Sequence, residues 1–269
     1  MQYKIGDVAR ILGISTDLLR YYEKKGVVTP IKDKQNDYRY YDAWDLNFLI
    51  DCLWYKSFGF GIPQIAYMEC DCYYGDLLSV LEEKQDEMQE SIRHQELLLH
   101  RLKQHCDQVS RIKDYAGKCD IAFCPEIIRY LNRFDTAYDY SPEKQKLAKQ
   151  WQNYMPFLQR YFEIPPKDTE NYRYAWGFSL EMDYVDEFSV AAKPPVMHLP
   201  SVECIHSVFS SSGKNAFTAD LIDYMYDYAE QNGYTVTGSA RGNLICSILE
   251  DGANTGYFEV WLPVTKDPL

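Results

Sequence analysis

The chain has 269 residues with 28 basic and 40 acidic side chains, and its 46% apolar and 25% charged content is that of an ordinary globular protein, which argues against disorder over most of the chain. This length allows about two domains, each able to bury a core. No stretch approaches the roughly 18–20 uncharged apolar residues of a membrane span, and Lys4, Asp7 and Arg10 occupy the place of a signal sequence. We therefore expect a cytoplasmic protein with no membrane partner.

The acidic balance is uneven along the chain. Residues 1–41 carry eight basic and five acidic side chains, whereas residues 120–269 carry 12 basic and 21 acidic ones. A basic head on an acidic body suggests that the head meets a polyanion. Because a surplus of three charges is common on solvated surfaces, the motifs must decide the question.

The first thirty residues predict two short helices joined by a tight turn. Apolar residues of the first helix recur at helical spacing from Ile5 to Leu12, and Gly13 ends it. Ser15 or Thr16 can cap a second helix that ends at Gly26. Two helices joined in this way form a helix-turn-helix, whose second helix can enter the major groove of DNA.

A hairpin is predicted directly after these helices. The polar run from Lys32 to Asp37 has the composition of a turn, and the aromatic run from Tyr38 to Tyr41 is typical of a strand. A further helix is expected from Asp45.

Three motifs in this order resemble the winged-helix DNA-binding domain of MerR-type transcription regulators. They are Ile5-Gly6-Asp7-Val8-Ala9, Leu19-Arg20-Tyr21-Tyr22-Glu23, and Asn36 through Tyr41. The resemblance covers about seventy residues. It implies a homodimer that binds palindromic double-stranded promoter DNA and twists the promoter into a form that RNA polymerase can use.

The same motifs supply candidate DNA contacts. The fork of Arg20 suits guanine or phosphate, tyrosine hydroxyls can donate to phosphate, and basic side chains of the hairpin lie where a wing would touch the backbone. We interpret Tyr22, Tyr40 and Tyr41 as core aromatics. The predicted DNA-binding residues are Thr16, Arg20, Tyr21, Lys24, Lys34, Tyr38, Arg39 and Lys56.

From about Asp76 to Ala116 the chain has no proline or glycine and shows heptads. Nine of twelve seam positions are apolar, which predicts a coiled coil. Some forty residues make a rod of roughly 60 Å, too long to be buried in its own domain. The MerR resemblance implies that this helix pairs antiparallel with its copy in a dimer. The alternative is a single helix packed on the C-terminal domain.

The eight cysteines raise a rival function, because metal- or oxidant-sensing regulators of this family carry cysteines near the ends of the dimer helix. Cys70, Cys72, Cys119 and Cys124 lie there, and thiolates could hold a soft ion. The Cys-x-Cys spacing departs from the usual two-residue spacer, and no secretory context favours disulfides. We expect buried, inert thiols with no metal and no cofactor.

Residues 120–269 show a strand and helix pattern that runs twice, with Lys193-Pro194-Pro195 between the halves. The first half has an amphipathic segment at 127–134, a helix at 142–162 and an alternating strand at 172–180. The second half has a strand at 202–209, a helix at 216–231 and strands at 244–249 and 256–264. This order resembles the duplicated GyrI-like effector-binding domain of multidrug-sensing MerR regulators.

That resemblance implies a pocket in which aromatic rings and a carboxylate hold a lipophilic, cationic small molecule. Thirteen of the 24 tyrosines follow residue 119, and aromatic faces attract organic cations. The family's pocket acid falls on Asn243 here, so Glu259, Glu181 or Glu203 would have to substitute, or the ligand need not be a cation. These rings could equally be sheet core. The predicted ligand-binding residues are Tyr174, Trp176, Phe217, Asn243, Tyr257, Glu259 and Trp261.

No catalytic constellation competes strongly, and we expect no enzyme. His198 and His206 flank Glu203 and Cys204, which leaves a ligand-hydrolysing domain as a weak alternative. The predicted fold class is α+β, with a winged helix-turn-helix head at 1–75, a dimerisation helix forming an antiparallel coiled coil at 76–118 and a duplicated α/β GyrI-like domain at 119–269. The predicted function is a transcription activator that responds to a hydrophobic effector.

Overall fold

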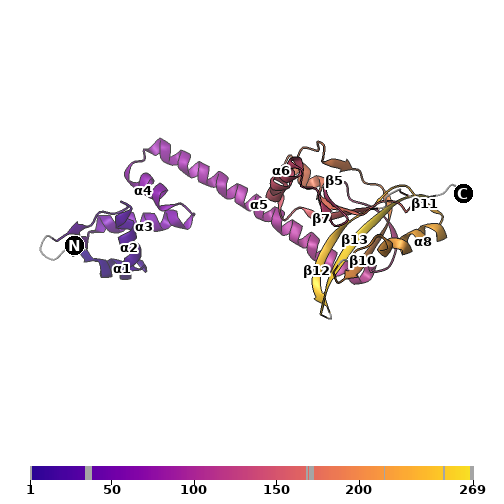
Figure 1. The fold of residues 1–269 in the computed structure, drawn as a ribbon. Coiled ribbons are helices and arrows are strands. Elements are labelled where there is room, and N and C mark those ends of the chain that lie inside the picture. Colours follow the sequence, from indigo (N-terminus) through magenta and orange to yellow (C-terminus); the bar gives the residue numbers. More distant parts are fainter. Residues whose placement is uncertain are drawn as a thin grey trace. The chain divides into compact units, whose positions relative to one another are not determined.

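The computed structural model describes residues 2–33, 38–167, 169, 173–214, 216–250 and 252–266. Its contacts divide the chain into two compact units, Met1–Gln95 and Glu96–Leu269, which we call the head and the body (Figure 1). Each unit has its own hydrophobic core, so both can be described separately. Within the described ranges, none of the helices has the length and apolar content needed to cross a membrane.

The head begins with the predicted helix-turn-helix. Gly13 ends the first helix with φ 67, a left-handed conformation that glycine adopts without steric cost. The Ser15 hydroxyl accepts a hydrogen bond of 3.1 Å from the Leu18 amide and so caps the second helix. The helices of the head are α1 (Ile5–Leu12), α2 (Thr16–Lys24), α3 (Ala43–Ser57) and α4 (Ile62–Cys70).

The predicted hairpin is confirmed as part of a three-stranded sheet. Strands β2 (Ile31–Lys32) and β3 (Arg39–Tyr41) pair antiparallel, with Ile31 opposite Tyr40, and β1 (Tyr3–Lys4) covers the other edge of β3. Lys34, a predicted DNA contact, lies outside the described residues.

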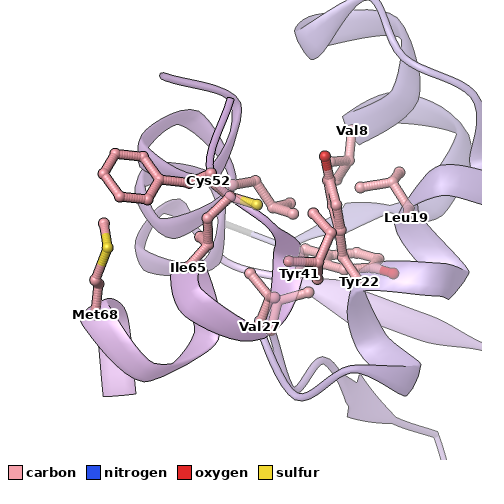
Figure 2. Close-up of a cluster of buried hydrophobic side chains, with 12 residues drawn as sticks. Val8, Leu19, Tyr22, Val27, Tyr41, Cys52, Ile65 and Met68 are labelled. Carbon is pink, nitrogen blue, oxygen red and sulfur yellow. The ribbon is translucent and has the colours of Figure 1, made fainter. Parts of the chain in front are cut away.

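The core of the head joins its four helices with β1 and β3 (Figure 2). Val8 of α1, Leu19 and Tyr22 of α2, and Tyr41 of β3 have no exposed surface. Burial of two tyrosine rings and several aliphatic side chains supplies much of the stability of so small a unit. The core interpretation is therefore confirmed for Tyr22 and Tyr41, whereas Tyr40 is only half-buried.

Helix α5 (Tyr74–Tyr115) spans 42 residues and confirms the long helix expected from Asp76 to Ala116. Its first part belongs to the head and its remainder, from Glu96, to the body. Many of the predicted seam positions remain exposed in the single chain. Those with more than two-fifths of their surface exposed are Leu78, Met88, Ile92, Leu99, Leu102 and Val109.

The body is built around a ten-stranded sheet, antiparallel throughout. The main path runs β4-β10-β13-β12-β7-β8-β5-β6, while β11 pairs with β13 and β9 with β5. The strands are β4 (Asp120–Phe123), β5 (Ile127–Phe134), β6 (Ala137–Tyr138), β7 (Gln159–Ile164), β8 (Ala175–Glu181), β9 (Met197–Leu199), β10 (Glu203–Ser212), β11 (Tyr234–Val236), β12 (Ala240–Glu250) and β13 (Ala253–Lys266).

The predicted repeat of strand and helix is visible in the topology. In the first half, β5 leads through helix α6 (Pro142–Trp151) to β7 and β8, and β8 pairs with both other strands. In the second half, β10 leads through helix α8 (Asp223–Gln231) to β12 and β13, and β13 pairs in the same way. The two halves meet where β7 pairs with β12. The remaining helix, α7 (Met182–Glu187), follows β8.

Two predicted helices are shorter than the sequence pattern suggested. The first was expected to reach residue 162, but α6 ends at Trp151 and gives way to a 3-10 turn, Gln152–Tyr154, and then to β7. Pro156, which has no amide hydrogen for a helical bond, accounts for this early end. The second was expected from residue 216, but α8 begins at Asp223 after a 3-10 turn, Ala219–Ile222.

Alternation along the strands gives the body sheet two unlike faces. The aromatic face, which α8 covers, carries Phe162, Trp176, Phe209 and Phe258 in one hydrophobic cluster. The polar face is defined by Glu181, His206, Arg241, Asn243 and Glu259, which alternate with those rings along the same strands. The second part of α5 contributes to this side, since Ile112 packs on Val208 and Ile245.

Candidate functional sites

The exposed surface of α2 is the candidate nucleic-acid surface of the head. Arg20, Tyr21 and Lys24 are exposed, and Thr16 at the start of the helix is half-exposed. The Arg20 guanidinium lies 3.0 Å from the Asp17 carboxylate, but its side chain keeps 58% of its surface exposed. An exposed pair of this kind contributes little to stability, so Arg20 can exchange Asp17 for another anion at small cost.

Glu23 holds the hairpin against α2. Its carboxylate accepts a hydrogen bond of 2.5 Å from the Arg39 side chain and lies 3.2 Å from the Lys32 amine. Burial would raise the pKa of Glu23, but the hydrogen bonds and charges of Arg39 and Lys32 outweigh it and lower that pKa. The predicted DNA contact Arg39 is thus tied to the protein in the free chain, and its position fixes the hairpin relative to α2.

The other predicted contacts of the head are exposed. Tyr38, at the hairpin, is 57% exposed, and the Lys4 amine lies 5.7 Å from the centre of its ring. Lys56 is exposed on α3. The described contacts therefore lie on the surface, as a DNA-binding role requires, and α2 and the hairpin are joined by one ion-pair network.

In the body, a cavity of about 420 Å³ opens between α5 and the polar face of the sheet. Its wall from α5 has the spacing of a single helix face. The lining residues are Gln104, Asp107, Gln108, Arg111 and Tyr115 of α5, and Asp120, Ala122, Phe123, Glu181, His206, Val208, Ile245, Glu259 and Trp261 of the sheet.

Glu259 lies at the centre of a hydrogen-bond network in this cavity. Its carboxylate accepts a bond of 3.3 Å from the Gln108 amide and lies 3.1 Å from His206 Nε2. The other ring nitrogen of His206 lies 2.9 Å from Asp120. The imidazole ring packs edge-on against Tyr115, and its centre lies 5.6 Å from that of Trp261.

The charges around His206 control its protonation. Burial lowers its pKa, but hydrogen bonds to Glu259 and Asp120, with the charges of both carboxylates, outweigh burial and raise that pKa above the usual value. When protonated, this imidazole is the internal cation that offsets the charge of Glu259.

A second carboxylate, Glu181, faces the same cavity and accepts a hydrogen bond of 2.6 Å from the Gln159 amide. Burial raises the pKa of Glu181, although the charge of Arg101 opposes this effect. The cavity lining holds four carboxylates against one arginine, Arg111, and His206. Such a surplus of negative charge in a partly desolvated space favours a cationic ligand over an anionic one.

The structure separates the seven predicted ligand-binding residues. Glu259 and Trp261 line the cavity. Asn243 is buried on the same face, where its side-chain oxygen accepts a hydrogen bond of 3.1 Å from Ser179. Tyr257 packs beside Ile112 and donates a hydrogen bond of 2.7 Å to Glu250.

The remaining three predicted residues pack on the opposite, aromatic face. The Phe217 ring lies 5.3 Å from Tyr174 and 4.7 Å from Trp176, between ring centres. All three contact the cluster of Phe162 and Phe258 beneath α8. They are therefore separated from Glu259 by the thickness of the sheet.

Sequence reasoning missed most of the cavity wall. Gln104, Gln108, Arg111 and Tyr115 recur at intervals of three and four, which places them on one face of α5. That polar stripe is visible in the sequence, but the same helix carries apolar heptads, which predict a coiled coil and not the wall of a ligand cavity. His206 could have been placed beside Glu259 only with the pairing of β10 and β13 known.

The structure does not bring the rival constellations together. Cys119 packs with the aromatic-face cluster beneath α8, whereas Cys124 packs on Trp261 on the polar side. His198 lies on β9, and its Nε2 atom is 2.7 Å from the Glu126 carboxylate, whereas His206 lies on β10. In the part of the chain that the structure describes, no three histidine, cysteine or acidic side chains form a metal-binding group.

Comparison with known proteins finds a family match in the head. Residues 4–41 match the MerR family, described as MerR family regulatory protein. The HTH-type transcriptional regulator CueR of Escherichia coli is 28% identical over 130 residues, which cover 46% of this chain and 90% of that relative. CueR of Salmonella typhi is 37% identical over 60 residues, covering 22% of this chain and 44% of the relative.

Solved structures show lower similarity. A cryo-EM structure of an EcmrR-DNA complex in EcmrR-RPo aligns with 98% of this chain and 100% of its own, at 18% identity and a TM-score of 0.38. A crystal structure of MtaN, the N-terminus of the Bacillus subtilis multidrug transporter activator, aligns with 38% of this chain and 95% of its own, at 24% identity and a TM-score of 0.35.

A helix-turn-helix with a hairpin fixed to its second helix is the head of a DNA-binding regulator. The family match spans this unit from α1 to β3, and the relatives described above are transcriptional regulators. The head of this chain therefore matches the MerR family of regulatory proteins over residues 4–41, and the chain is similar to transcriptional regulators that carry such a head.

Proposed function

We propose that this chain is a DNA-binding transcription regulator of the MerR family, of the multidrug-sensing type with a GyrI-like effector domain, and that it activates transcription when a lipophilic organic cation binds the body cavity. The observation that carries the proposal is the cavity between α5 and the polar face, where Glu259 and Glu181 face an open space of about 420 Å³. This volume is in the range of sites for drug-sized molecules.

The chemistry of the wall suits such a ligand. Trp261, Tyr115 and Phe123 offer aromatic surface, and organic cations gain about 0.5–2 kcal/mol over such a ring. The carboxylate of Glu259 is 19% exposed and offset in the free chain by His206. An entering cation would take the place of His206 beside Glu259. Glu259 would then supply the carboxylate that the resemblance places at the position of Asn243.

The position of α5 supports a route from ligand to DNA. Five cavity residues belong to α5, including Gln108, which donates to Glu259. A ligand that alters this contact changes how α5 packs on the sheet. A ligand shifts an equilibrium only through its different affinity for the two states, and contacts to α5 provide that difference.

We further propose that two copies pair through α5 as an antiparallel coiled coil. Exposed apolar residues of α5, among them Leu78, Ile92, Leu99 and Leu102, are placed to be buried by a second helix. In the head, an apolar hollow of about 390 Å³ between Trp54, Phe58 and Met88 extends this surface. The paired heads would then distort the promoter into a form that RNA polymerase can use. Contacts to the DNA phosphates would offset the energy needed to deform the duplex.

Two reciprocal substitutions test the proposal in the full-length protein. We expect Glu259→Gln to weaken binding of tetraphenylphosphonium about tenfold, because a charged partner is removed, while DNA affinity at fixed salt is kept. We expect Arg20→Ala to weaken DNA binding by about 1–3 kcal/mol while cation binding is unchanged. Calorimetry measures the affinity for the cation. Fluorescence anisotropy measures the affinity for DNA duplexes that the wild-type protein selects from a random pool.

Matched controls separate these effects from general damage. Glu203→Gln removes an acid from β10 outside the cavity lining, and Arg10→Ala removes an exposed arginine from α1 instead of α2. Neutral triphenylphosphine oxide controls for apolar binding. Cation affinity that is the same in Glu259→Gln and the wild type would contradict the assignment of the cavity.

A further inference from the structure

Cys124 and Cys204 form a buried pair of thiols on the polar side of the body sheet. Cys124 is 2% exposed and Cys204 is fully buried, and both pack on Trp261. Cys124 directly follows β4, and its amide donates a hydrogen bond of 3.1 Å to the Val202 carbonyl, so the two cysteines lie diagonally across neighbouring chain segments. Both sulfur atoms lie at the backbone of Val202: the Cys204 thiol donates to its carbonyl oxygen over 3.5 Å, and its amide lies 3.3 Å from the Cys124 sulfur.

A buried arginine completes this site. Arg241 of β12 is 7% exposed, and its Nη2 atom lies 2.6 Å from the Cys124 sulfur and 2.8 Å from the Pro200 carbonyl. Arg241 lies opposite Glu163 in the ladder, but Glu163 is occupied by Arg129 through bonds of 2.7 and 3.2 Å.

Across the described ranges, no carboxylate lies within ion-pair distance of Arg241, and its Nε atom has no hydrogen-bond partner. A buried guanidinium without a counter-ion is costly. The Cys124 sulfur is therefore placed to act as its anion.

Two hydrogen-bond donors approach the Cys124 sulfur, which also lies 3.3 Å from the Val202 carbonyl oxygen and 3.9 Å from the Pro200 carbonyl oxygen. The Val202 amide donates to its sulfur over 3.3 Å, in addition to the Arg241 guanidinium. The hydrogen bond from Cys204, and then the amide of Val202 and the charge of Arg241, lower the pKa of Cys124 to about 6 against the opposing effect of burial. The pKa of Cys204 is raised by the same hydrogen bond and by burial, so Cys204 keeps its proton.

We propose that Cys124 and Cys204 form a redox site that hydrogen peroxide converts to an intramolecular disulfide. The Cys124 thiolate attacks one peroxide oxygen, a sulfur–oxygen bond forms, the oxygen–oxygen bond breaks, and hydroxide leaves. The Cys204 sulfur then attacks the Cys124 sulfenic acid, the sulfur–sulfur bond forms, and water leaves with the Cys204 proton. Two sulfur atoms are oxidised, and the peroxide is reduced to water and hydroxide.

The location of the pair gives a small oxidant a route to it. β4 is an edge strand of four residues that pairs with β10, and Phe123 beside Cys124 is 71% exposed. Short edge strands open locally at lower cost than the centre of a sheet. Opening β4 exposes Cys124 while Arg241, on the central strand β12, stays in place.

The redox site shares a wall with the effector cavity but does not depend on it. Trp261 touches both cysteines and lines the cavity, and Ala122 and Phe123 of β4 line it as well. A disulfide between Cys124 and Cys204 would tie the end of β4 to β10 at this wall. Oxidation is therefore a second input to the regulator, beyond the cationic effector.

Peroxide treatment of the reduced full-length protein, without effector or DNA, tests the site. After blocking with N-ethylmaleimide and digestion, we expect one dominant cross-linked peptide that joins Cys124 to Cys204, reversed by dithiothreitol. We expect the rate of its formation to fall below about pH 6, where the thiolate is protonated. A difference in absorbance at 240 nm between wild type and Cys124→Ser should titrate at the same pH.

Matched variants identify the role of each group. Arg241→Gln should move the midpoint of the rate profile upward by at least about one pH unit, whereas Arg160→Gln, on β7, should leave it in place. If Arg241→Gln does not fold, the pH profile and absorbance of the wild type decide the matter. Disulfides involving exposed Cys70 or Cys106 instead, or a midpoint near 8.5, would overturn the proposal. Since no effector is present, this result is independent of the proposed cation binding.

Discussion

The two faces of the body sheet are built from the same strands but have opposite chemistry. On the aromatic face, Phe162 contacts Trp176, Phe209, Phe217 and Phe258, with ring centres 5.2 to 6.0 Å apart. The polar face instead carries carboxylates, amides and guanidinium groups around an open cavity.

This contrast teaches that aromatic content alone does not locate a cation site. The rings of the aromatic face pack against one another and leave no space for a ligand, so that face is a hydrophobic core. The fewer rings of the polar face stand beside unfilled space and buried charge, which is what a ligand can use. The three following predictions test this contrast, from the largest effect to the smallest.

Removal of the central ring of the aromatic face should be the most damaging change. Phe162 is fully buried, and we expect Phe162→Ala to lower the free energy of unfolding by about 3–5 kcal/mol, because both transfer energy and a cavity are involved. Urea unfolding followed by tryptophan fluorescence measures the loss. A loss below 1 kcal/mol would mean that this face is not the main core of the body.

The two tryptophans should respond differently to the same substitution. Trp261→Leu should weaken tetraphenylphosphonium binding by roughly 0.5–2 kcal/mol, since the cation loses an aromatic face. Trp176→Leu should lower stability and leave cation affinity in the folded protein unchanged. Calorimetric titration of both variants, at a temperature where each is folded, measures this. Equal losses of affinity would show that the sheet does not separate the two rings functionally.

The pH dependence of stability should report the charged network of the polar face. Because the pKa of His206 is raised in the folded protein, its stabilising contribution is fully present below the unfolded value of about 6.5 and is lost as pH rises through the folded value. The groups facing it are Tyr115 of α5, Asp120 of β4, and Glu259 and Trp261 of β13.

We therefore expect His206→Asn to cost about 1.5 kcal/mol at pH 6 and less at pH 8.5. Urea unfolding of both proteins at each pH measures this difference. A cost that grows with pH would mean that the imidazole stabilises the fold in its neutral form.

Much of the head was predictable because its signals are local. The spacing from Ile5 to Leu12, Gly13 and the cap at Ser15 each act within a few residues, and the structure confirms the elements they predict. The ion pair between Glu23 and Arg39 was not predicted, because it joins residues sixteen positions apart whose approach depends on the hairpin.

The body was less predictable because its sites depend on strand pairing. The repeat of strand and helix was visible, but the face on which a residue lies depends on the register, and a bulge between Leu244 and Cys246 shifts it. Asn243 and Glu259 meet only because β12 pairs with β13, and the contact of Cys124 with Arg241 joins residues 117 positions apart. No local pattern contains such contacts.

Gly242 of β12 is a position at which the body sheet has no room for a side chain. A methyl group there would lie 2.1 Å from the Glu259 carbonyl and 2.5 Å from the Phe162 ring, so neither the backbone nor the core leaves space for a side chain. The scaffold is thus fixed at the same strand that presents Arg241 and Asn243 to the polar face. For protein engineering, this separates what must be kept from what can be varied: libraries at Gln108, Arg111 and Trp261 can change the ligand while the aromatic face keeps the fold.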